Sequence, residues 1–206
     1  ERRWPEDRPV RGGWRATGRI RRRRRLGTAM KVYTRKGDDG TTGLLHGGRV
    51  AKDSPQPTAY GDVDEAQAVI GLARAVADGE LAGILIDIER DLWVVMAELA
   101  CNPDRLDDAG SRPGPEMVDR LESLIDDVSA RFDPPTEFVV PGEDEVSARL
   151  DVARAVCRRA ERSVLSAAAP GSSVVPYLNR LSDLLWTLAR WSEGTSVTAR
   201  SLGDPD

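Results

Sequence analysis

The sequence predicts an all-α protein, an antiparallel bundle of five helices. Five segments carry apolar residues at the three-to-four-residue spacing of a helix, and no segment shows the strict alternation of a half-buried strand. The joins between these segments are short and contain Gly or Pro, which favours antiparallel neighbours. With 206 residues, of which 40% are hydrophobic, the chain is long enough for one sizeable core.

Each predicted helix is bounded by residues that start or stop helices. The first stops at Gly79, the second at Pro103 and the fourth at Pro170, because glycine and proline interrupt a helix. The third begins with Pro115, since proline is tolerated in a first turn, and stops before Pro134. The predicted helices span residues 58–77, 81–101, 115–131, 143–168 and 176–195.

The segment FVVPGE, residues 138–143, lies between the third and fourth predicted helices. It begins with Phe138 and is too apolar for an ordinary exposed turn. We therefore expect it to close one end of the bundle.

The charge of the chain is unevenly distributed. Residues 1–29 hold eleven Arg and three acidic residues, a net +8, so with a total of −4 the remainder carries −12. An acidic body argues against a nucleic-acid partner. We expect residues 1–29 to be a disordered extension, 30–200 the folded domain and 201–206 a flexible tail. The extension has three open interpretations: a targeting peptide, a nucleic-acid-binding arm, or sequence that precedes a native start at Met30.

The spacing of the cysteines, the single histidine and the lack of a long apolar span exclude further classes of protein. Cys101 and Cys157 lie far apart in apolar helical patterns, which favours reduced structural thiols over a disulfide or metal framework. The only histidine, His46, cannot by itself form a His-ligated metal site. No span is long and apolar enough to cross a bilayer. These features predict a cytoplasmic protein without a membrane partner.

The stretch TRKGDDGTTGLLHGG, residues 34–48, indicates a loop that holds an anion. Its five glycines permit positive φ, so successive backbone N–H groups can converge on one centre, and hydroxyl and basic side chains add donors. A triphosphate fits these donors, and Asp38 and Asp39 fit the same site if Mg²⁺ accompanies the phosphates. The alternative is a pair of glycine turns at the domain entrance. We interpret His46 as a loop residue rather than a ligand or base.

The fourth predicted helix carries a charged face beside its core stripe. Arg154, Arg158, Glu161 and Arg162 share this face at positions i, i+4, i+7 and i+8. Three guanidinium groups over two turns repel one another unless anions or carboxylates lie opposite, and Glu161 alone cannot balance them. The acidic cluster within residues 62–65 could supply partners from another helix or another subunit. The alternative is a solvated face with local ion pairs.

The last predicted helix carries a second polar stripe. Asn179, Asp183, Trp186 and Arg190 fall in register beside the leucines of the core. An amide, a carboxylate and an indole aligned along one stripe are unlike an ordinary solvent-exposed helix surface. They suit a pocket that hydrogen-bonds a heterocycle or sugar at one end and stacks an aromatic at the other.

Three blocks in this order, YTRKGDDGTTGLL, RAVCRRAER and YLNRLSDLLWTLAR, resemble the PduO-type ATP:cob(I)alamin adenosyltransferases. YGDVDEAQAVIG and FVVPGE lie between them in the expected places, so the resemblance covers nearly all of the chain from Met30 to the last predicted helix. It implies a homotrimer of five-helix bundles with an active site at each subunit interface. It also implies an ATP-dependent alkyl transferase that moves the 5′-deoxyadenosyl group of ATP to cob(I)alamin, giving adenosylcobalamin and triphosphate.

The resemblance implies roles for individual residues. The ATP phosphates, with Mg²⁺, would be held by Thr34, Arg35, Lys36, Gly37, Thr42, Gly43 and Lys52. The nucleotide would contact Arg158, Arg159, Glu161, Arg162 and Asn179. Arg154 and Asp183 match an ion-pair network of the interface and active site, so the catalytic set is Arg158, Asp183, Arg154 and Glu161. Phe138 matches the aromatic residue that occupies the lower face of cobalamin and displaces its axial base, and Trp186, where Phe is expected, would line the same pocket.

The implied chemistry needs no Ser, Cys or His nucleophile, because Co(I) is itself the nucleophile. The protein has to align the 5′-carbon of ATP with cobalt and stabilise the departing triphosphate. An adenosylcobalamin-dependent mutase and a reductase are further implied partners. Two alternatives stay open: a carrier that hands adenosylcobalamin to a mutase, and another ATP-dependent transferase on a helical bundle.

Overall fold

The computed structural model describes residues 32–200, so the predictions for residues 1–29 and 201–206 lie outside the described residues. The chain divides into two units between Thr34 and Arg35. Of the first unit the structure describes residues 32–34, which are exposed. All helices and strands below belong to the second unit.

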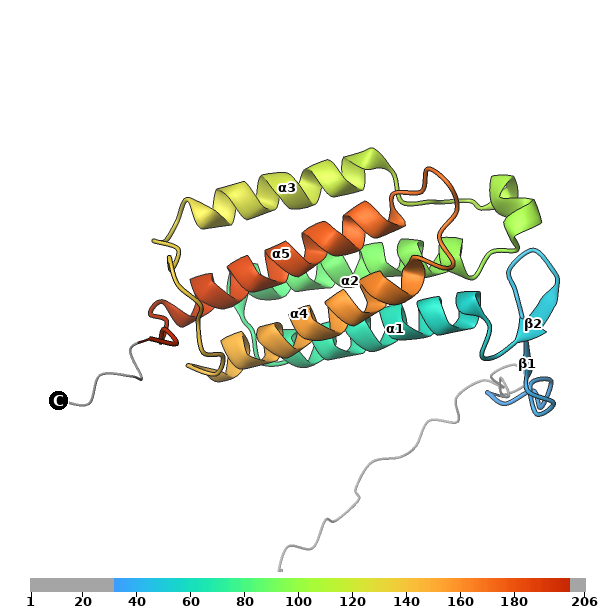
Figure 1. Ribbon diagram of the computed structural model, residues 1–206, viewed down its shortest axis with the longest axis horizontal. Helices are drawn as coiled ribbons and strands as arrows, with labels where there is room; N and C mark the ends of the chain where they lie inside the picture. Colours follow the sequence, from blue (N-terminus) through green and yellow to red (C-terminus); the bar gives the residue numbers. More distant parts are fainter. Residues whose placement is uncertain (1–31, 201–206) are drawn as a thin grey trace, which may run out of the picture. The chain divides into compact units, whose positions relative to one another are not determined.

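Helices make up most of the second unit (Figure 1). They are α1 (Pro55–Arg74), α2 (Gly79–Leu99), the 3₁₀ helix η1 (Pro103–Asp108), α3 (Pro115–Ser129), α4 (Glu145–Val164) and α5 (Val174–Glu193). Of the predicted all-α five-helix bundle, the mostly helical architecture is therefore confirmed. Two short strands, β1 (Thr41–Gly43) and β2 (Arg49–Ala51), pair antiparallel. They were missed because three residues are too few to show alternation.

The helix boundaries follow local sequence signals. α1 begins at Pro55, ahead of the predicted residue 58, because proline fits a first turn, where its missing N–H would have no partner. α4 begins behind a capping box, in which Asp144 Oδ1 accepts a hydrogen bond of 2.8 Å from the backbone N–H of Ser147. After α5, Gly194 has a φ of 71°, which leaves the helical region and ends the helix.

The core is formed by the apolar stripes that face each other between helices. Leu150 and Cys157 of α4 and Leu178 and Leu185 of α5 are fully buried. Burial raises the pKa of the Cys157 thiol to about 12. Within residues 32–200, none of the helices combines the length and apolar character that a membrane crossing requires.

α1 and α4 run antiparallel to each other. Near the start of α4, Arg149 Nη1 donates to the carbonyl oxygen of Leu72, close to the end of α1, at 2.8 Å. Further along α4, Arg159 pairs with Glu65, which lies earlier in α1. The start of α4 therefore lies beside the end of α1.

Candidate active site

The glycine-rich loop, residues 35–52, is a hairpin held together by Arg49. Arg49 Nε donates to Thr41 Oγ1 at 3.0 Å, and Arg49 Nη2 lies 3.6 Å from Asp39 Oδ1. The Thr41 backbone N–H and hydroxyl also donate to Asp39. These two bonds, together with the charge of Arg49, lower the pKa of the Asp39 carboxyl. Sequence reasoning missed Arg49, because its partners come together only when the hairpin forms.

Lys52 lies against Gly37 at the other side of this loop. A Cβ atom added at Gly37 would lie 3.1 Å from Lys52 Nζ and 3.1 Å from the carbonyl oxygen of Thr41. Gly37 is therefore needed for a close approach between loop segments. The two predicted phosphate-binding residues Gly37 and Lys52 are brought together by the structure.

Backbone conformation differs among the glycines of the loop. Left-handed backbone, with φ between 60° and 100°, occurs at Gly40, Gly47, Gly48, Arg35 and His46. Gly37 and Gly43, which sequence reasoning also proposed for positive φ, do not adopt it. A non-glycine residue in this region costs about 1–3 kcal/mol, so the turns at Arg35 and His46 are imposed by the surrounding loop.

The loop is anchored to the end of α2. The N–H of Leu45 donates to the carbonyl of Ala100 at 2.8 Å, and the N–H of Asn102 donates back to Leu45 at 3.0 Å. The Asn102 side chain also donates to Gly47 at 3.2 Å. These bonds fix the base of the hairpin to one end of the helices.

Two arginines of α4 are paired: Arg154, which belongs to the predicted charged face, and Arg159, which does not. Arg154 Nε donates to Asp151 Oδ1 at 3.1 Å. Arg159 pairs with Glu65 of α1, so the expectation that the acidic cluster of the first helix can bind arginines is confirmed for this residue.

Two other arginines of this face and Asp183 of α5 are open to solvent. Arg158, Arg162 and Asp183 are exposed and form no ion pair within residues 32–200. Between them, Asn179 Nδ2 donates to Glu161 Oε1 at 2.9 Å, which joins α5 to α4. The structure thus presents two unpaired guanidinium groups next to a fixed amide and carboxylate, an arrangement that suits an anionic, hydrogen-bonding ligand.

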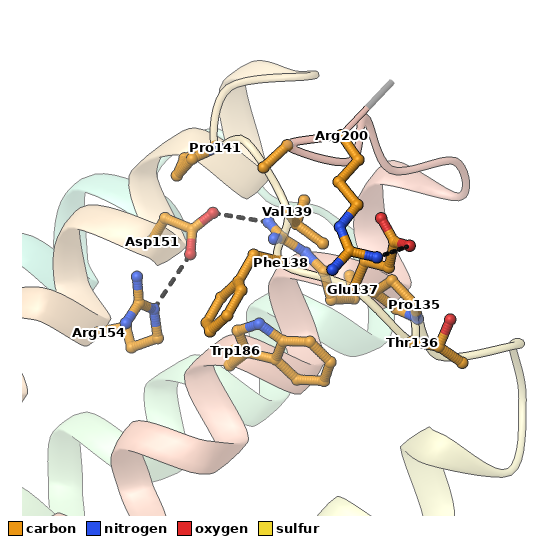
Figure 2. Close-up of a pocket in the computed structure, with 12 residues that line it drawn as sticks. Pro135, Thr136, Glu137, Phe138, Val139, Pro141, Asp151, Arg154, Trp186 and Arg200 are labelled. Atoms are coloured by element: carbon orange, nitrogen blue, oxygen red, sulfur yellow. Dashed lines mark hydrogen bonds and ion pairs between the residues drawn. The ribbon is translucent and has the colours of Figure 1, made fainter. Parts of the chain in front are cut away.

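A pocket of about 910 Å³ lies where α4 begins and α5 ends (Figure 2). Phe138 and Trp186 both line it, and Figure 2 shows them lying in the same pocket as Arg154 and Asp151. Phe138 is 90% exposed. The expectation that residues 138–143 close the end of the bundle is therefore wrong: this segment forms one wall of an open pocket, because the helices fill their own core.

The wall that carries Phe138 is held by residues near the described end of the chain. The N–H of Val140 donates to the carbonyl of Val197, and the N–H of Ala199 donates to the carbonyl of Phe138, both at 2.8 Å. Val139 and Thr198 form the bridge between these bonds. Backbone hydrogen bonds on either side of Val139 thus hold the Phe138 segment in an extended form.

Buried charges line the pocket behind these aromatic residues. Arg190, which is 2% exposed, donates from Nη2 to Asp151 Oδ2 at 2.6 Å, and its Nε lies 3.0 Å from Glu193 Oε1. Sequence reasoning placed Arg190 on the polar stripe of the last helix but missed Asp151 and Glu193. The available signal was that Asp151 falls on the buried stripe of α4, one turn after Ser147.

The hairpin loop and residues 135–141, which line the pocket, lie at opposite ends of the helices (Figure 1). The loop precedes α1, whereas the pocket lies beside the start of α4, which packs near the end of α1. α1 has 20 residues, so its two ends are about 30 Å apart. A triphosphate chain is much shorter than this distance. The structure therefore does not bring the predicted phosphate residues and corrin residues of one chain together.

The described residues offer few ligands for a metal ion. No group of three or more His, Cys, Asp or Glu that could hold one occurs in residues 32–200. Near the predicted phosphate site, Asp39 is occupied by Thr41 and Arg49, whereas the Asp38 side chain is exposed. Because Mg²⁺ that travels with phosphates needs only one or two protein carboxylates, Asp38 fits such an ion.

Comparisons with known proteins agree on one family. Residues 32–192 match the family model described as cobalamin adenosyltransferase. The chain is 45% identical over 171 residues to a corrinoid adenosyltransferase of Mycobacterium tuberculosis, covering 78% of this chain and 87% of the relative. It is 38% identical over 184 residues to a corrinoid adenosyltransferase of Bacillus subtilis, covering 85% and 91%.

A solved structure agrees with these sequence relatives. It is a variant PduO-type ATP:corrinoid adenosyltransferase from Lactobacillus reuteri, complexed with cobalamin and ATP. The TM-score is 0.77 and the identity 26%, over 82% of this chain and 97% of that chain. The chain therefore belongs to the cobalamin adenosyltransferase family.

Proposed function

We propose that this protein is an ATP:cob(I)alamin adenosyltransferase. It transfers the 5′-deoxyadenosyl group of ATP to the cobalt of cobalamin and releases triphosphate. The observation that carries the proposal is the match of almost the whole folded unit to corrinoid adenosyltransferases, one of them in a complex with cobalamin and ATP. The open aromatic pocket and the unpaired guanidinium groups supply what this chemistry needs.

The reaction is a displacement at carbon. Co(I) attacks the 5′-carbon of ATP with its electron pair, the cobalt–carbon bond forms, and the carbon–oxygen bond to the triphosphate breaks. The triphosphate leaves with the bonding electrons. No proton has to be removed from the carbon, which agrees with a site that requires no Ser, Cys or His nucleophile.

The leaving triphosphate is stabilised by cations and backbone donors. In this proposal, the loop residues 34–37, 42–43 and Lys52 hold the phosphates, and Arg158 and Arg162 approach from α4 with Arg159 nearby. Donors placed where negative charge develops are worth about 10²–10³-fold in rate each. Mg²⁺ bound to the phosphates would neutralise part of their charge, and Asp38 is the loop carboxylate that fits it.

The pocket at the other end of the helices receives the corrin. Phe138 is exposed in the isolated chain, and burying an aromatic side chain of this size stabilises a complex by about 1.5–3 kcal/mol. An aromatic ring against the lower face of cobalamin excludes an axial ligand. Loss of that ligand makes Co(II) easier to reduce to Co(I), so Phe138 has its main role before the transfer step.

A complete site is formed between subunits of a homotrimer of antiparallel five-helix bundles. The separation of about 30 Å between loop and pocket, estimated from the length of α1, supports this arrangement. The loop of one subunit then serves the pocket of its neighbour, with Asp183 and Arg154 in the ion-pair network at the contact. We further propose a cytoplasmic enzyme that receives reduced cobalamin from a reductase and supplies an adenosylcobalamin-dependent mutase.

One assay tests the proposed activity. The protein is incubated anaerobically with ATP, Mg²⁺ and chemically reduced cobalamin, and the absorbance of a light-sensitive cobalt–carbon product is followed. The expected result is stoichiometric formation of adenosylcobalamin and triphosphate. A carrier would bind the corrinoid without consuming ATP, and a different transferase would leave the corrinoid spectrum unchanged; either result would contradict the proposal.

A further inference from the structure

We propose that Arg190 and Asp151 are positioning residues of the corrin pocket: their buried ion pair fixes Arg154 and Trp186 at the pocket wall. This inference rests on the proposed function, because it assumes that the pocket receives cobalamin. Neither Arg190 nor Asp151 needs to touch the substrate. Each acts through a neighbouring side chain that is more open to the pocket.

The geometry joins two helices through one carboxylate. Asp151 on α4 uses its two oxygens for two different arginines: Oδ2 accepts from Arg190 Nη2 at 2.6 Å, and Oδ1 accepts from Arg154 Nε at 3.1 Å. Figure 2 shows the bond between Asp151 and Arg154 at one side of the pocket. The guanidinium carbon of Arg190 also lies 6.0 Å from the ring centre of Trp186, within the range of a cation–π contact. Arg190 therefore links both pocket-lining side chains.

A second carboxylate, that of Glu193, also lies next to Arg190. Arg190 Nε lies 3.0 Å from Glu193 Oε1, and the hydroxyl of Ser196 donates to the same oxygen at 2.5 Å. The side chains of Arg190, Asp151 and Glu193 are each at most 5% exposed. The buried Arg190 guanidinium is thus held by a hydrogen bond to Asp151 and by an ion-pair contact with Glu193, although its Nε forms no hydrogen bond.

Stability alone does not explain this arrangement. Apolar residues of similar volume are often as stable as, or more stable than, a buried ion pair, because both charges lose their hydration. The neighbouring positions of α5, such as Leu184, Leu185 and Leu188, are fully buried and apolar. The charge of Arg190 thus serves to orient neighbouring side chains rather than to fill the core. The side chains that it orients, Arg154 and Trp186, line the pocket.

The test uses the full chain with Asp151→Asn, which keeps the shape but weakens the bonds to both arginines. We expect the KM for cob(I)alamin to rise at least about 10-fold, the effect of weakening one hydrogen bond to a charged group that orients the pocket wall. The KM for ATP should stay within about twofold, since neither Asp151 nor Arg190 is among the residues proposed to hold ATP. Asp151→Glu should restore part of the affinity. The visible spectrum of bound cob(II)alamin, recorded without ATP, should change in Asp151→Asn and recover in Asp151→Glu.

A matched control is Glu98→Gln. Glu98 is a carboxylate whose side chain is 2% exposed and which pairs with Arg112 at 2.9 Å, outside the pocket. This variant should lower thermal stability without changing the KM for cob(I)alamin. Should Asp151→Asn fail to fold, Arg190→Lys, which keeps the charge, must show the same split between the two KM values.

The outcomes separate this inference from the proposed function. An unchanged KM for cob(I)alamin in Asp151→Asn, or equal effects in Asp151→Asn and Glu98→Gln, would overturn the positioning role while the wild type still forms adenosylcobalamin. A wild type that binds no corrinoid would overturn the proposed function and, with it, the inference. A selective rise in the KM for cob(I)alamin with rescue by Asp151→Glu supports it.

Discussion

Substitution of Gly37 by Ala tests whether the hairpin loop holds the phosphates. The new Cβ atom would lie 3.1 Å from the backbone oxygen of Thr41 and 3.1–3.2 Å from the end of the Lys52 side chain. The backbone oxygen belongs to β1 and moves little, whereas the Lys52 side chain can swing away. The expected consequence is a displaced Lys52 ammonium group in a loop that otherwise keeps its fold.

The size of the effect follows from the lost contact. A hydrogen bond to a charged group contributes about 1.5–3 kcal/mol net. At about 1.4 kcal/mol per factor of ten, the KM for ATP should rise about 10- to 150-fold. The melting temperature should not fall, because Gly37 has no positive φ and the loop lies outside the helical core.

The assay measures initial rates of adenosylcobalamin formation at varied ATP with saturating cob(I)alamin. Gly83→Ala is the control, because a Cβ atom at this exposed position of α2 meets nothing within 4 Å. It should stabilise α2 by up to about 1 kcal/mol and leave the KM for ATP unchanged. An unchanged KM in Gly37→Ala, or an equal rise in Gly83→Ala, would refute the assignment of this loop to the phosphates.

Three further predictions concern the rest of the site and the core. Arg158→Ala or Asp183→Ala should lower the turnover number by at least about 10²-fold, with unchanged helix content by circular dichroism because both side chains are exposed; full activity in either variant would refute its place in the catalytic set. Phe138→Ala should change stability by less than about 0.5 kcal/mol and should slow product formation more from Co(II) than from chemically supplied Co(I). Equal losses from the two starting states would contradict the axial-ligand argument. Because burial raises the pKa of Cys157 to about 12 and Cys101 is buried as well, neither thiol should react with a disulfide reagent at pH 8 until denaturant is added; rapid labelling of the native protein would show that this part of the core opens.

The helices could be predicted from the sequence because their signals are local. Apolar spacing and Pro115 at a helix start act within a few residues, so they are readable without knowledge of the fold. Gly79, predicted to stop the first helix, instead begins α2, and α1 ends earlier, at Arg74. The observed helix boundaries differ from the predicted ones by a few residues. Examples are Pro55, a first-turn proline at which α1 begins, and Val164, at which α4 ends early. The glycine loop was also recognisable, although its left-handed positions were only partly the predicted ones.

The contacts that shape the candidate site were decided by tertiary packing. Asp151 and Arg190 are 39 residues apart, and they meet only because α4 and α5 pack side by side in one particular register. The segment 138–143 was expected to close one end of the bundle, yet Phe138 is exposed on the wall of a pocket. Composition and periodicity therefore determined the helices and the kinds of side chain available. Only the packing of those helices decided which charges were buried together, since that depends on distances between residues far apart in the chain.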